Sequence, residues 1–189
     1  MALKQFTAAL ALLGLGAICA CRRQAAGDPA EGQTPTSVSV SSSSFGNGDR
    51  IPQKYTCDGA GLSPDIHLPA PPSATKSLLL VMDDPDASGF VHWLVYNIPP
   101  STRDIPEGAS SRAALPAGAA EGENSLGNTG YFGPCPPAPD PHHYVFRLYA
   151  LDTDFHLGAE KTKTELTAAA KGHILAEGRM TALYARRGD

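Results

Sequence analysis

The pattern of hydrophobic and polar positions is dominated by three continuous apolar runs of strand length. They cover Lys76–Met82, Val91–Ile98 and Tyr144–Leu151. Pro99 closes the second run, and the third is rich in the aromatic and β-branched residues that strands favour. Continuous apolar runs of this length predict strands that are buried in a core.

Weaker patterns predict the smaller elements. Ser37–Ser41 alternates polar and apolar residues with a period of two, as a half-buried strand does. Residues 162–174 have helical spacing, and Thr162 or Thr164 can cap the first turn. An edge strand is expected to follow over Leu175–Arg186. Several strands with one or two late helices predict a mainly β protein, a β-sandwich with peripheral helices.

Composition and charge limit the class of protein. Hydrophobic residues make up 42% of the 189 residues and charged residues 18%, so the chain can bury a core and disorder along its whole length is excluded. The net charge of −4 includes no basic excess, which argues against a nucleic-acid partner. The four cysteines lack paired C-x-x-C spacing, and we expect neither a metal nor a cofactor.

Met1–Ala20 predicts a secretory signal peptide. Lys4 supplies a basic start, and the apolar run that follows is shorter than the roughly 20 residues that cross a bilayer as a helix. The end of the run resembles a bacterial lipobox, although Cys19 stands where a small residue is more usual. Cys21 is then the expected lipidation site and mature N-terminus, and an ordinary signal peptide is the alternative.

Residues 21–36 are polar and rich in Ala, Gly, Pro and Thr, which is typical of a flexible linker. The folded domain is expected over residues 37–189. Together these segments predict an exported lipoprotein of the bacterial cell envelope, which is attached to the membrane through its N-terminal lipid.

Polar residues gather where the three apolar runs begin or end. Asp83–Asp86 follows the first run, His92 interrupts the second, and His142 and His143 precede the third, behind a stiff proline-rich stretch over residues 133–139. Each feature has an ordinary structural explanation: an Asp-Pro turn, a core histidine with satisfied ring nitrogens, and a rigid linker. A calcium loop is a poor match, because the glycine and distal glutamate of an EF-hand are missing. If the three strands are neighbours, these acidic and basic clusters converge.

Several separated motifs, in this order and spacing, resemble the phosphatidylethanolamine-binding protein family in its bacterial Raf kinase inhibitor-like branch. The resemblance covers nearly all of residues 37–186. The segments that carry it are Tyr55–Pro64, Asp84–Ala87, His92–Pro99, Glu107–Gly108, Gly127–Pro137 and His142–Asp152.

The resemblance implies an antiparallel β-sandwich with C-terminal helices and a small pocket that binds an anion, such as phosphate or a phospholipid headgroup. Asp86 would support the turn that carries the pocket aspartate. Carried over to this sequence, the ligand-binding residues are Asp84, His92, Cys135, Pro136, Pro137, His142 and Tyr144.

Two positions depart from the family pattern. Ser88 replaces the last proline of the first motif, which loosens that turn or adds a hydroxyl donor. His143 replaces an arginine. Because histidine is largely neutral at pH 7, we expect any pairing of His143 with the acidic motif to be weaker and dependent on pH.

A disulfide between Cys57 and Cys135 is expected. These two cysteines remain after processing at Cys21, and the resemblance sets both near the pocket mouth. Export would place them in an oxidising compartment. Two reduced thiols that line the pocket are the alternative.

The expected function is therefore that of a non-enzymatic protein that binds a small anion or phospholipid headgroup and modulates a partner protein. A protease inhibitor that acts through the loops of Thr102–Asn128 is an alternative. A hydrolase-type enzyme that uses Asp84 and His92 as base and acid is a second alternative, although no G-x-S-x-G motif occurs in the sequence.

Overall fold

The computed structural model describes residues 34–110, 114–155, 157–158 and 160–187. The predicted signal peptide, the lipidation site Cys21 and the linker up to residue 33 lie outside the described residues. In chain order, the elements are β1 (Thr36–Val38), the 3-10 turn η1 (Gln53–Tyr55), β2 (Ile66–His67), β3 (Ser77–Asp84), the 3-10 turn η2 (Pro85–Ala87), β4 (Phe90–Ile98), β5 (Asp104–Ile105), β6 (Ala120–Glu121), β7 (His142–Leu151), α1 (Lys163–Ala170) and β8 (Ile174–Tyr184).

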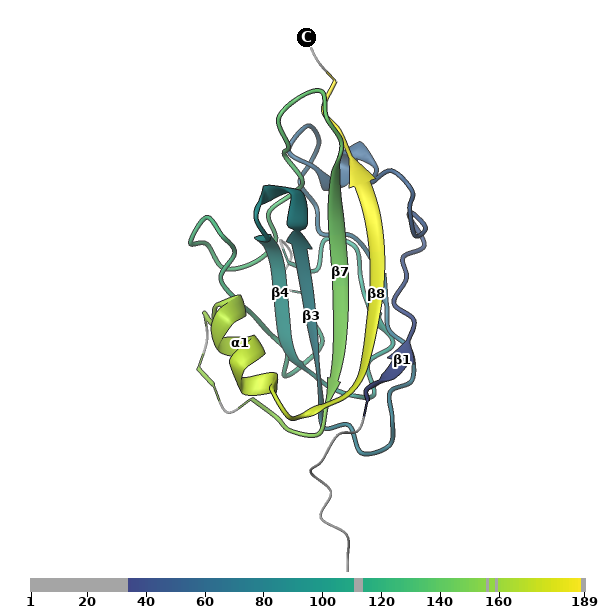
Figure 1. Cartoon of the computed structure of the whole chain (residues 1–189), viewed down its shortest axis with the longest axis vertical. Helices are drawn as coiled ribbons and strands as arrows, with labels where there is room; N and C mark the ends of the chain where they lie inside the picture. Colours follow the sequence, from purple (N-terminus) through teal and green to yellow (C-terminus); the bar gives the residue numbers. More distant parts are fainter. Residues whose placement is uncertain (1–33, 111–113, 156, 159, 188–189) are drawn as a thin grey trace, which may run out of the picture. The chain divides into compact units, whose positions relative to one another are not determined.

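The main sheet contains six strands in the order β1-β8-β7-β3-β4-β6, and Figure 1 shows β1, β8, β7, β3 and β4 side by side. β2 pairs with β5 in a separate two-stranded sheet. Neighbouring strands are antiparallel except β1, which runs parallel to β8. The prediction of a mainly β protein is confirmed. The wholly antiparallel sandwich is not confirmed, because β1 adds to the outer edge of β8 in the parallel direction and makes the main sheet mixed.

The three strongest apolar runs form β3, β4 and β7, which lie side by side in the sheet. β3 is buried along its whole length, because its two faces pack into different cores. Leu78, Leu80 and Met82 belong to the larger core, whereas Leu79 and Val81 pack with Leu166 and Ala170 of α1 on the other face. Burial on both faces explains why the run is apolar without alternation.

One α-helix occurs in the described part of the chain, and it is shorter than the sequence predicts. Of the two threonines expected to cap the helix, Thr162 does so, through a reciprocal pair of hydrogen bonds with Glu165. The helix ends at Ala170, and Gly172 then takes a positive φ of 84°, which glycine adopts without strain. Ile174 therefore begins β8 instead of ending the helix, and β8 lies between β1 and β7 rather than at an edge.

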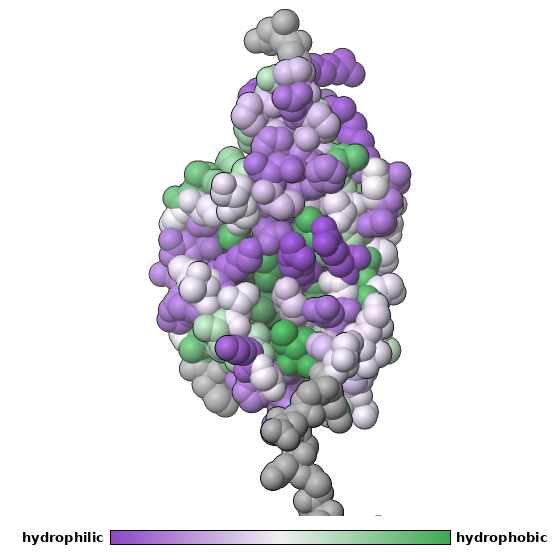
Figure 2. All heavy atoms as spheres, viewed as in Figure 1, coloured by the Kyte–Doolittle hydropathy of each residue, from purple (hydrophilic) through white to green (hydrophobic). Residues whose placement is uncertain are grey.

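The face that carries α1 is largely hydrophilic. Figure 2 shows hydrophilic side chains over most of this face, with apolar ones visible in small areas between them. Within the described residues, no helix has the length and apolar character needed to cross a membrane.

Candidate functional site

A cavity of about 260 Å³ opens where the end of β3, the start of β4 and the start of β7 meet. All seven residues predicted to bind a ligand line this cavity, which we call the pocket. Four further lining residues were missed. The lining comprises Asp84, Ala87, Phe90, His92, Leu126, Phe132, Cys135, Pro136, Pro137, His142 and Tyr144.

Strand pairing explains why these distant residues meet. β3 and β7 are antiparallel and Asp83 pairs with Val145, so the end of β3 lies beside the start of β7. Side chains alternate along a strand, and His142 and Tyr144 are two residues apart, so both point to the pocket side of the sheet. His143 lies between them and is exposed on the other side.

Asp84 holds the pocket together and is almost fully buried, with a side chain that is 3% exposed. Its Oδ1 accepts hydrogen bonds from the backbone N–H groups of Asp86 at 2.9 Å and Ala87 at 3.1 Å, and so caps η2. Its Oδ2 accepts the Nδ1–H of His142 at 2.7 Å. Both carboxylate oxygens are therefore occupied by protein donors.

His92 reaches the pocket because of a β-bulge. Met82 of β3 pairs with Trp93, whereas Asp83 pairs with Val91, so His92 is an extra residue in β4. Bulges re-aim side chains and recur next to functional sites. Without this bulge, strict alternation would turn His92 away from the face that Trp93 occupies.

The surroundings of His92 keep it neutral. Its Nδ1–H donates to the backbone carbonyl of Phe132 at 2.8 Å, since a carbonyl can only accept. Burial lowers the pKa of His92 below its usual value, and this effect outweighs the attraction of Asp84 for the charged form. The neutral ring leaves Nε2 free for a ligand, because no other group of the described residues bonds it.

Tyr144 has a buried hydroxyl group that makes no hydrogen bond of normal geometry within the described residues, although the Asp84 carboxylate lies close enough to interact with it. Burial raises the pKa of Tyr144, and the nearby negative charge of Asp84 raises it further. The phenol therefore stays protonated and keeps an O–H group that it can donate. The His92 ring lies edge-on to the Tyr144 ring, with 5.1 Å between the ring centroids.

The two departures from the family pattern lie just outside the pocket. The backbone N–H and the Nδ1–H of His143 donate to Oδ2 of Asp86 at 2.6 and 2.8 Å. These bonds, the backbone one first, lower the pKa of Asp86. Ser88 ends η2 with a φ of 56°, a conformation that the ring of a proline forbids. The replacement of proline by serine thus fits the turn that this chain forms.

An apolar rim surrounds the polar groups and contains three of the residues that sequence reasoning missed. Phe90 and Phe132 both lie against the His92 ring, with centroid distances of 4.9 and 5.8 Å, and their own ring centroids are 6.1 Å apart. Leu126 is 52% exposed at the edge of the pocket. Phe90 lies two residues before His92 and Phe132 lies inside the quoted Gly127–Pro137 motif, which are the signals that could have found them.

A disulfide joins Cys57 and Cys135, the pair expected from the sequence, with 5.4 Å between the Cα atoms. Cys135 belongs to the pocket wall together with Pro136 and Pro137. The backbone N–H of Cys57 also donates to the carbonyl of Pro134 at 3.1 Å. The loop that carries Cys57 is thus fastened to the pocket wall at two points.

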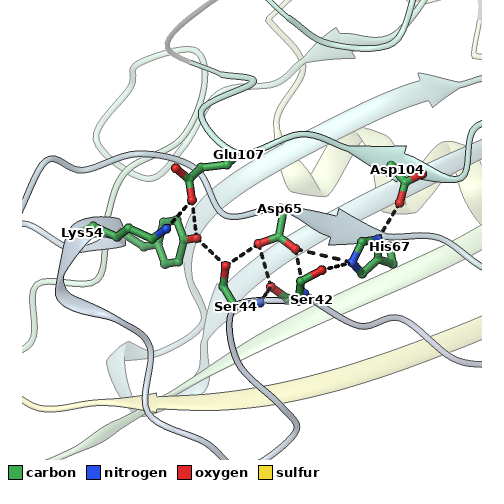
Figure 3. Close-up of polar contacts among 9 residues, drawn as sticks. Ser42, Ser44, Lys54, Asp65, His67, Asp104 and Glu107 are labelled. Atoms are coloured by element: carbon green, nitrogen blue, oxygen red, sulfur yellow. Dashed lines mark hydrogen bonds and ion pairs between the residues drawn. The ribbon is translucent and has the colours of Figure 1, made fainter.

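A second polar cluster lies outside the pocket and links the segments around η1, β2 and β5 (Figure 3). Tyr55 donates its O–H to Glu107 at 2.6 Å, and Ser44 donates to Asp65 at 2.6 Å. The Tyr55 and Ser44 hydroxyls are also 2.6 Å apart, and the one that donates to the other gives up its bond to a carboxylate, because each hydroxyl has a single proton. The quoted motif residues Tyr55 and Glu107 therefore hold loops together rather than line the pocket.

Part of this cluster has the order of a Ser-His-Asp triad. Ser43 contacts Nε2 of His67, and Nδ1 of His67 contacts Asp104. However, an Asp65 oxygen lies 3.6 Å from the same Nε2 and accepts the backbone N–H of Ser43 at 2.7 Å. A carboxylate at this position opposes the negative charge that an attacking serine develops. The side chains of His67 and Asp104 are also 43% and 64% exposed, so solvent weakens the contacts.

Comparison with known proteins identifies the family. The sequence model of the phosphatidylethanolamine-binding protein family matches residues 41–185. The chain therefore belongs to this family. A UPF0098 protein of Methanothermobacter thermautotrophicus is 41% identical over 151 residues, which cover 79% of this chain and 99% of that protein. The UPF0098 protein PH1269 of Pyrococcus horikoshii is 39% identical over 185 residues, 95% of this chain and 87% of that one.

Two solved structures support the same assignment. A putative phosphatidylethanolamine-binding protein homologue of Chlamydia trachomatis, CT736, superposes with a TM-score of 0.72 at 35% identity, over 78% of this chain and 97% of that chain. YbcL of E. coli, described as a new member of the mammalian family, superposes with a TM-score of 0.73 at 30% identity, over 79% and 98%. The fold is thus that of the phosphatidylethanolamine-binding proteins, mostly β with one helix in the described residues.

Proposed function

We propose that this protein is a non-enzymatic binding protein that holds a small anion or a phosphorylated headgroup in the pocket. The observation that carries the proposal is the buried hydroxyl of Tyr144, which makes no hydrogen bond of normal geometry within the described residues. Leaving such a donor unpaired costs about 1–3 kcal/mol. An oxyanion in the pocket accepts this hydrogen bond and removes the cost.

The histidines supply further donors when their Nε2 atoms carry a proton, since Nε2 of a neutral ring that donates through Nδ1 can only accept. The Nδ1–H of His142 is held by Asp84, so its Nε2 is directed away from that carboxylate and, once protonated, can donate to an anion. His92 is fixed through Nδ1 in the same way by Phe132. Asp84 acts on the ligand through His142, because its own oxygens are already engaged. A bare carboxylate facing the anion would instead repel it.

The apolar rim indicates what the rest of the ligand looks like. Phe90, Leu126 and Phe132 present hydrocarbon surface around the polar base of the pocket. A phosphate ester with an apolar substituent places its charged group on the donors and its hydrocarbon against the rim. A phospholipid headgroup with the first part of its lipid tail fits this description, and the family name refers to such a lipid. A partner protein would then bind the ligand-bound form of the protein differently from the free form.

Isothermal titration calorimetry with inorganic phosphate and with phosphoethanolamine tests the proposal. We expect binding by the wild type and a loss of about tenfold or more in affinity in His142→Ala, which removes a charge-assisted donor. His173→Ala is the matched control, because His173 forms a similar pair with Asp152 at 2.7 Å on the surface. Undetectable binding by the wild type at millimolar ligand would refute the anion site.

A further inference from the structure

A second, larger cavity lies at the end of β8, where η1 (blue in Figure 1) approaches this strand. It has a volume of about 600 Å³, and we call it the basic groove. Its lining carries three positive charges and one negative charge, whereas the whole chain has a net charge of −4. Such a local excess attracts anions. The lining residues are Arg50, Gln53, Asp58, Tyr184, Arg186 and Arg187.

Asp58 neutralises one of the three arginines. Its Oδ1 accepts the Nε–H of Arg186 at 3.0 Å, and its Oδ2 accepts the O–H of Tyr184 at 2.7 Å. These bonds, with that of Tyr184 the largest effect, lower the pKa of Asp58, so the carboxylate stays charged at neutral pH. Within the described residues, Asp58 forms its ion pair with Arg186 and none with Arg50 or Arg187.

Arg50 and Arg187 have no carboxylate partner among the described residues. The Arg50 guanidinium lies over the ring of Tyr184, 5.1 Å from the ring centroid, and donates to the carbonyl of Ala185. These two contacts hold Arg50 in place and leave its other donors free. Arg187 makes no hydrogen bond or ion pair within the described residues and lines the same groove. Guanidinium groups match the oxygen pairs of phosphate in a bidentate way.

We propose that the basic groove is a second anion site, in which Arg50 and Arg187 bind the phosphate of a soluble phosphate ester. The groove shares no lining residue with the pocket. The Cys57–Cys135 disulfide divides them, since Cys135 lines the pocket and Asp58, next to Cys57, lines the groove. The inference therefore stands independently of the function proposed for the pocket.

The groove lies at the opposite end of β8 from the point where β1 joins it. β1, through which the N-terminal segment enters the domain, pairs with Ala176 near the start of β8, whereas Tyr184 ends this strand. At about 3.3 Å per residue, these two points of β8 are about 26 Å apart. We therefore take a soluble phosphate ester as the ligand of the groove, and the vesicle experiment below tests a membrane headgroup as the other source of phosphate.

Two-dimensional NMR of the full chain with glycerol 3-phosphate tests the site. The Nε–H signals of Arg50 and Arg187 report on the groove, and the backbone N–H signals of Tyr144 and its neighbours report on the pocket. We expect saturable shifts of the arginine signals in the wild type and also in His142→Ala. Arg50→Gln/Arg187→Gln should weaken groove binding about tenfold or more, judged from the signals of Tyr184 and Arg186. Absence of arginine shifts at millimolar ligand would overturn the proposal even if the pocket binds.

Three comparisons separate a site from general charge attraction. Arg103→Gln/Arg179→Gln removes the same charge elsewhere and should change the affinity less than about twofold. Arg50→Lys/Arg187→Lys keeps the charge but loses bidentate geometry, and should still weaken binding several-fold. Equal losses in the groove and control variants would refute a defined site. In cosedimentation, adding phosphatidylglycerol to phosphatidylcholine vesicles should not increase the fraction of bound protein in a way that depends on Arg50 and Arg187. Such an increase would show that the groove binds a membrane headgroup and would overturn the assignment of a soluble ligand.

Discussion

At the scale of single residues, the hydroxyl groups of Tyr144 and Tyr131 differ in their hydrogen bonding. The Tyr131 O–H donates to the backbone carbonyl of Tyr55 at 2.7 Å, whereas the Tyr144 O–H makes no hydrogen bond of normal geometry within the described residues. Removing a satisfied hydroxyl loses a hydrogen bond, and removing an unsatisfied buried one relieves a desolvation cost. The two tyrosines therefore allow stability to be separated from function.

We predict that Tyr144→Phe leaves the ligand-free protein as stable as the wild type or more stable by up to about 1–2 kcal/mol, and weakens phosphate binding. Tyr131→Phe should do the reverse, with a loss of about 1 kcal/mol in stability and unchanged affinity. Urea unfolding and calorimetry measure the two quantities. A clear loss of stability in Tyr144→Phe would show that its hydroxyl has a structural partner and would remove the main support for the anion site.

Asp84→Asn tests whether this carboxylate orients His142 or faces the ligand. The substituted amide side chain would keep the shape and could still accept the N–H groups of η2, but would lose the negative charge that strengthens the hydrogen bond from Nδ1–H of His142 and so orients this ring. We predict weaker phosphate binding, by about tenfold, in calorimetry at pH 6. Tighter binding in the variant would mean that Asp84 faces the anion directly. Asp86→Asn is the control, because Asp86 pairs with His143 outside the pocket.

The lowered pKa of His92 predicts two opposite pH dependences. The unfolded chain binds a proton on this residue near pH 6.5, and the folded chain binds it only at lower pH. The contribution of the neutral ring to stability is therefore fully present above about pH 6.5 and is lost as the pH falls toward the folded pKa. A bound anion favours the charged ring, so affinity should rise over the same interval.

Titration with sulfate between pH 7.5 and 5.5 measures this effect, because sulfate keeps its charge over this interval. We expect affinity to rise several-fold on acidification in the wild type and less in His92→Gln, which lacks the imidazole that gains the charge. His173→Gln should follow the wild type. An identical pH profile in His92→Gln and the wild type would show that His92 does not face the anion.

The polar half of the pocket could be predicted from the sequence, whereas its apolar rim could not. Asp84, His92 and His142 stand out because polar residues at the ends of apolar runs need partners. Phe90, Leu126 and Phe132 are apolar residues in or near loops, where no periodicity shows which way they point. Their place depends on the β-bulge at His92 and on the loop that follows β6, which only tertiary structure fixes.

At the scale of elements, the continuous apolar runs predict β3, β4 and β7 to within about two residues at each end. The pairing of strands is not contained in such runs. The parallel contact of β1 with β8 depends on how the chain enters the sheet, and the early end of α1 depends on the positive φ of Gly172. Local patterns therefore identify elements better than they identify partners.

The disulfide is the element that connects the pocket wall to the loop after η1. Cys57 and Cys135 are 78 residues apart in sequence, so the crosslink restricts a long loop of the unfolded chain. We predict that Cys57→Ala/Cys135→Ala lowers the free energy of unfolding by about 4–5 kcal/mol in the chain-entropy account, and weakens phosphate binding because Cys135 and Pro136 lose their support. Urea unfolding and calorimetry measure both effects.

Dithiothreitol treatment of the wild type should reproduce this loss of stability, and the same treatment should leave the double variant unchanged. Unchanged stability of the reduced wild type would contradict the stabilising role. Two reactive thiols in the exported, folded protein, detected by alkylation without reductant, would show that the bond does not form there.

At the scale of the whole molecule, the chain divides into a family domain and a segment that precedes it. The family match begins at residue 41 and the first described strand begins at Thr36. The segment before them combines a short apolar run, the lipobox-like end at Cys21 and a polar stretch rich in Ala, Gly and Pro. We propose that this segment exports the protein and anchors it in the bacterial envelope, with the domain held on a flexible tether.

We predict that the mature protein begins at Cys21 and carries acyl chains on that residue. Intact mass spectrometry of the membrane fraction should show a chain that starts at Cys21 with acyl additions, because more than one chain is needed for stable anchoring. Cys21→Ser should abolish both the cleavage and the acyl mass, whereas Cys19→Ser, which restores a small residue at the unusual lipobox position, should keep them. A soluble, unmodified protein cleaved at another residue would refute the anchor and leave an ordinary signal peptide. The binding sites of the domain would then act free in solution rather than beside a membrane.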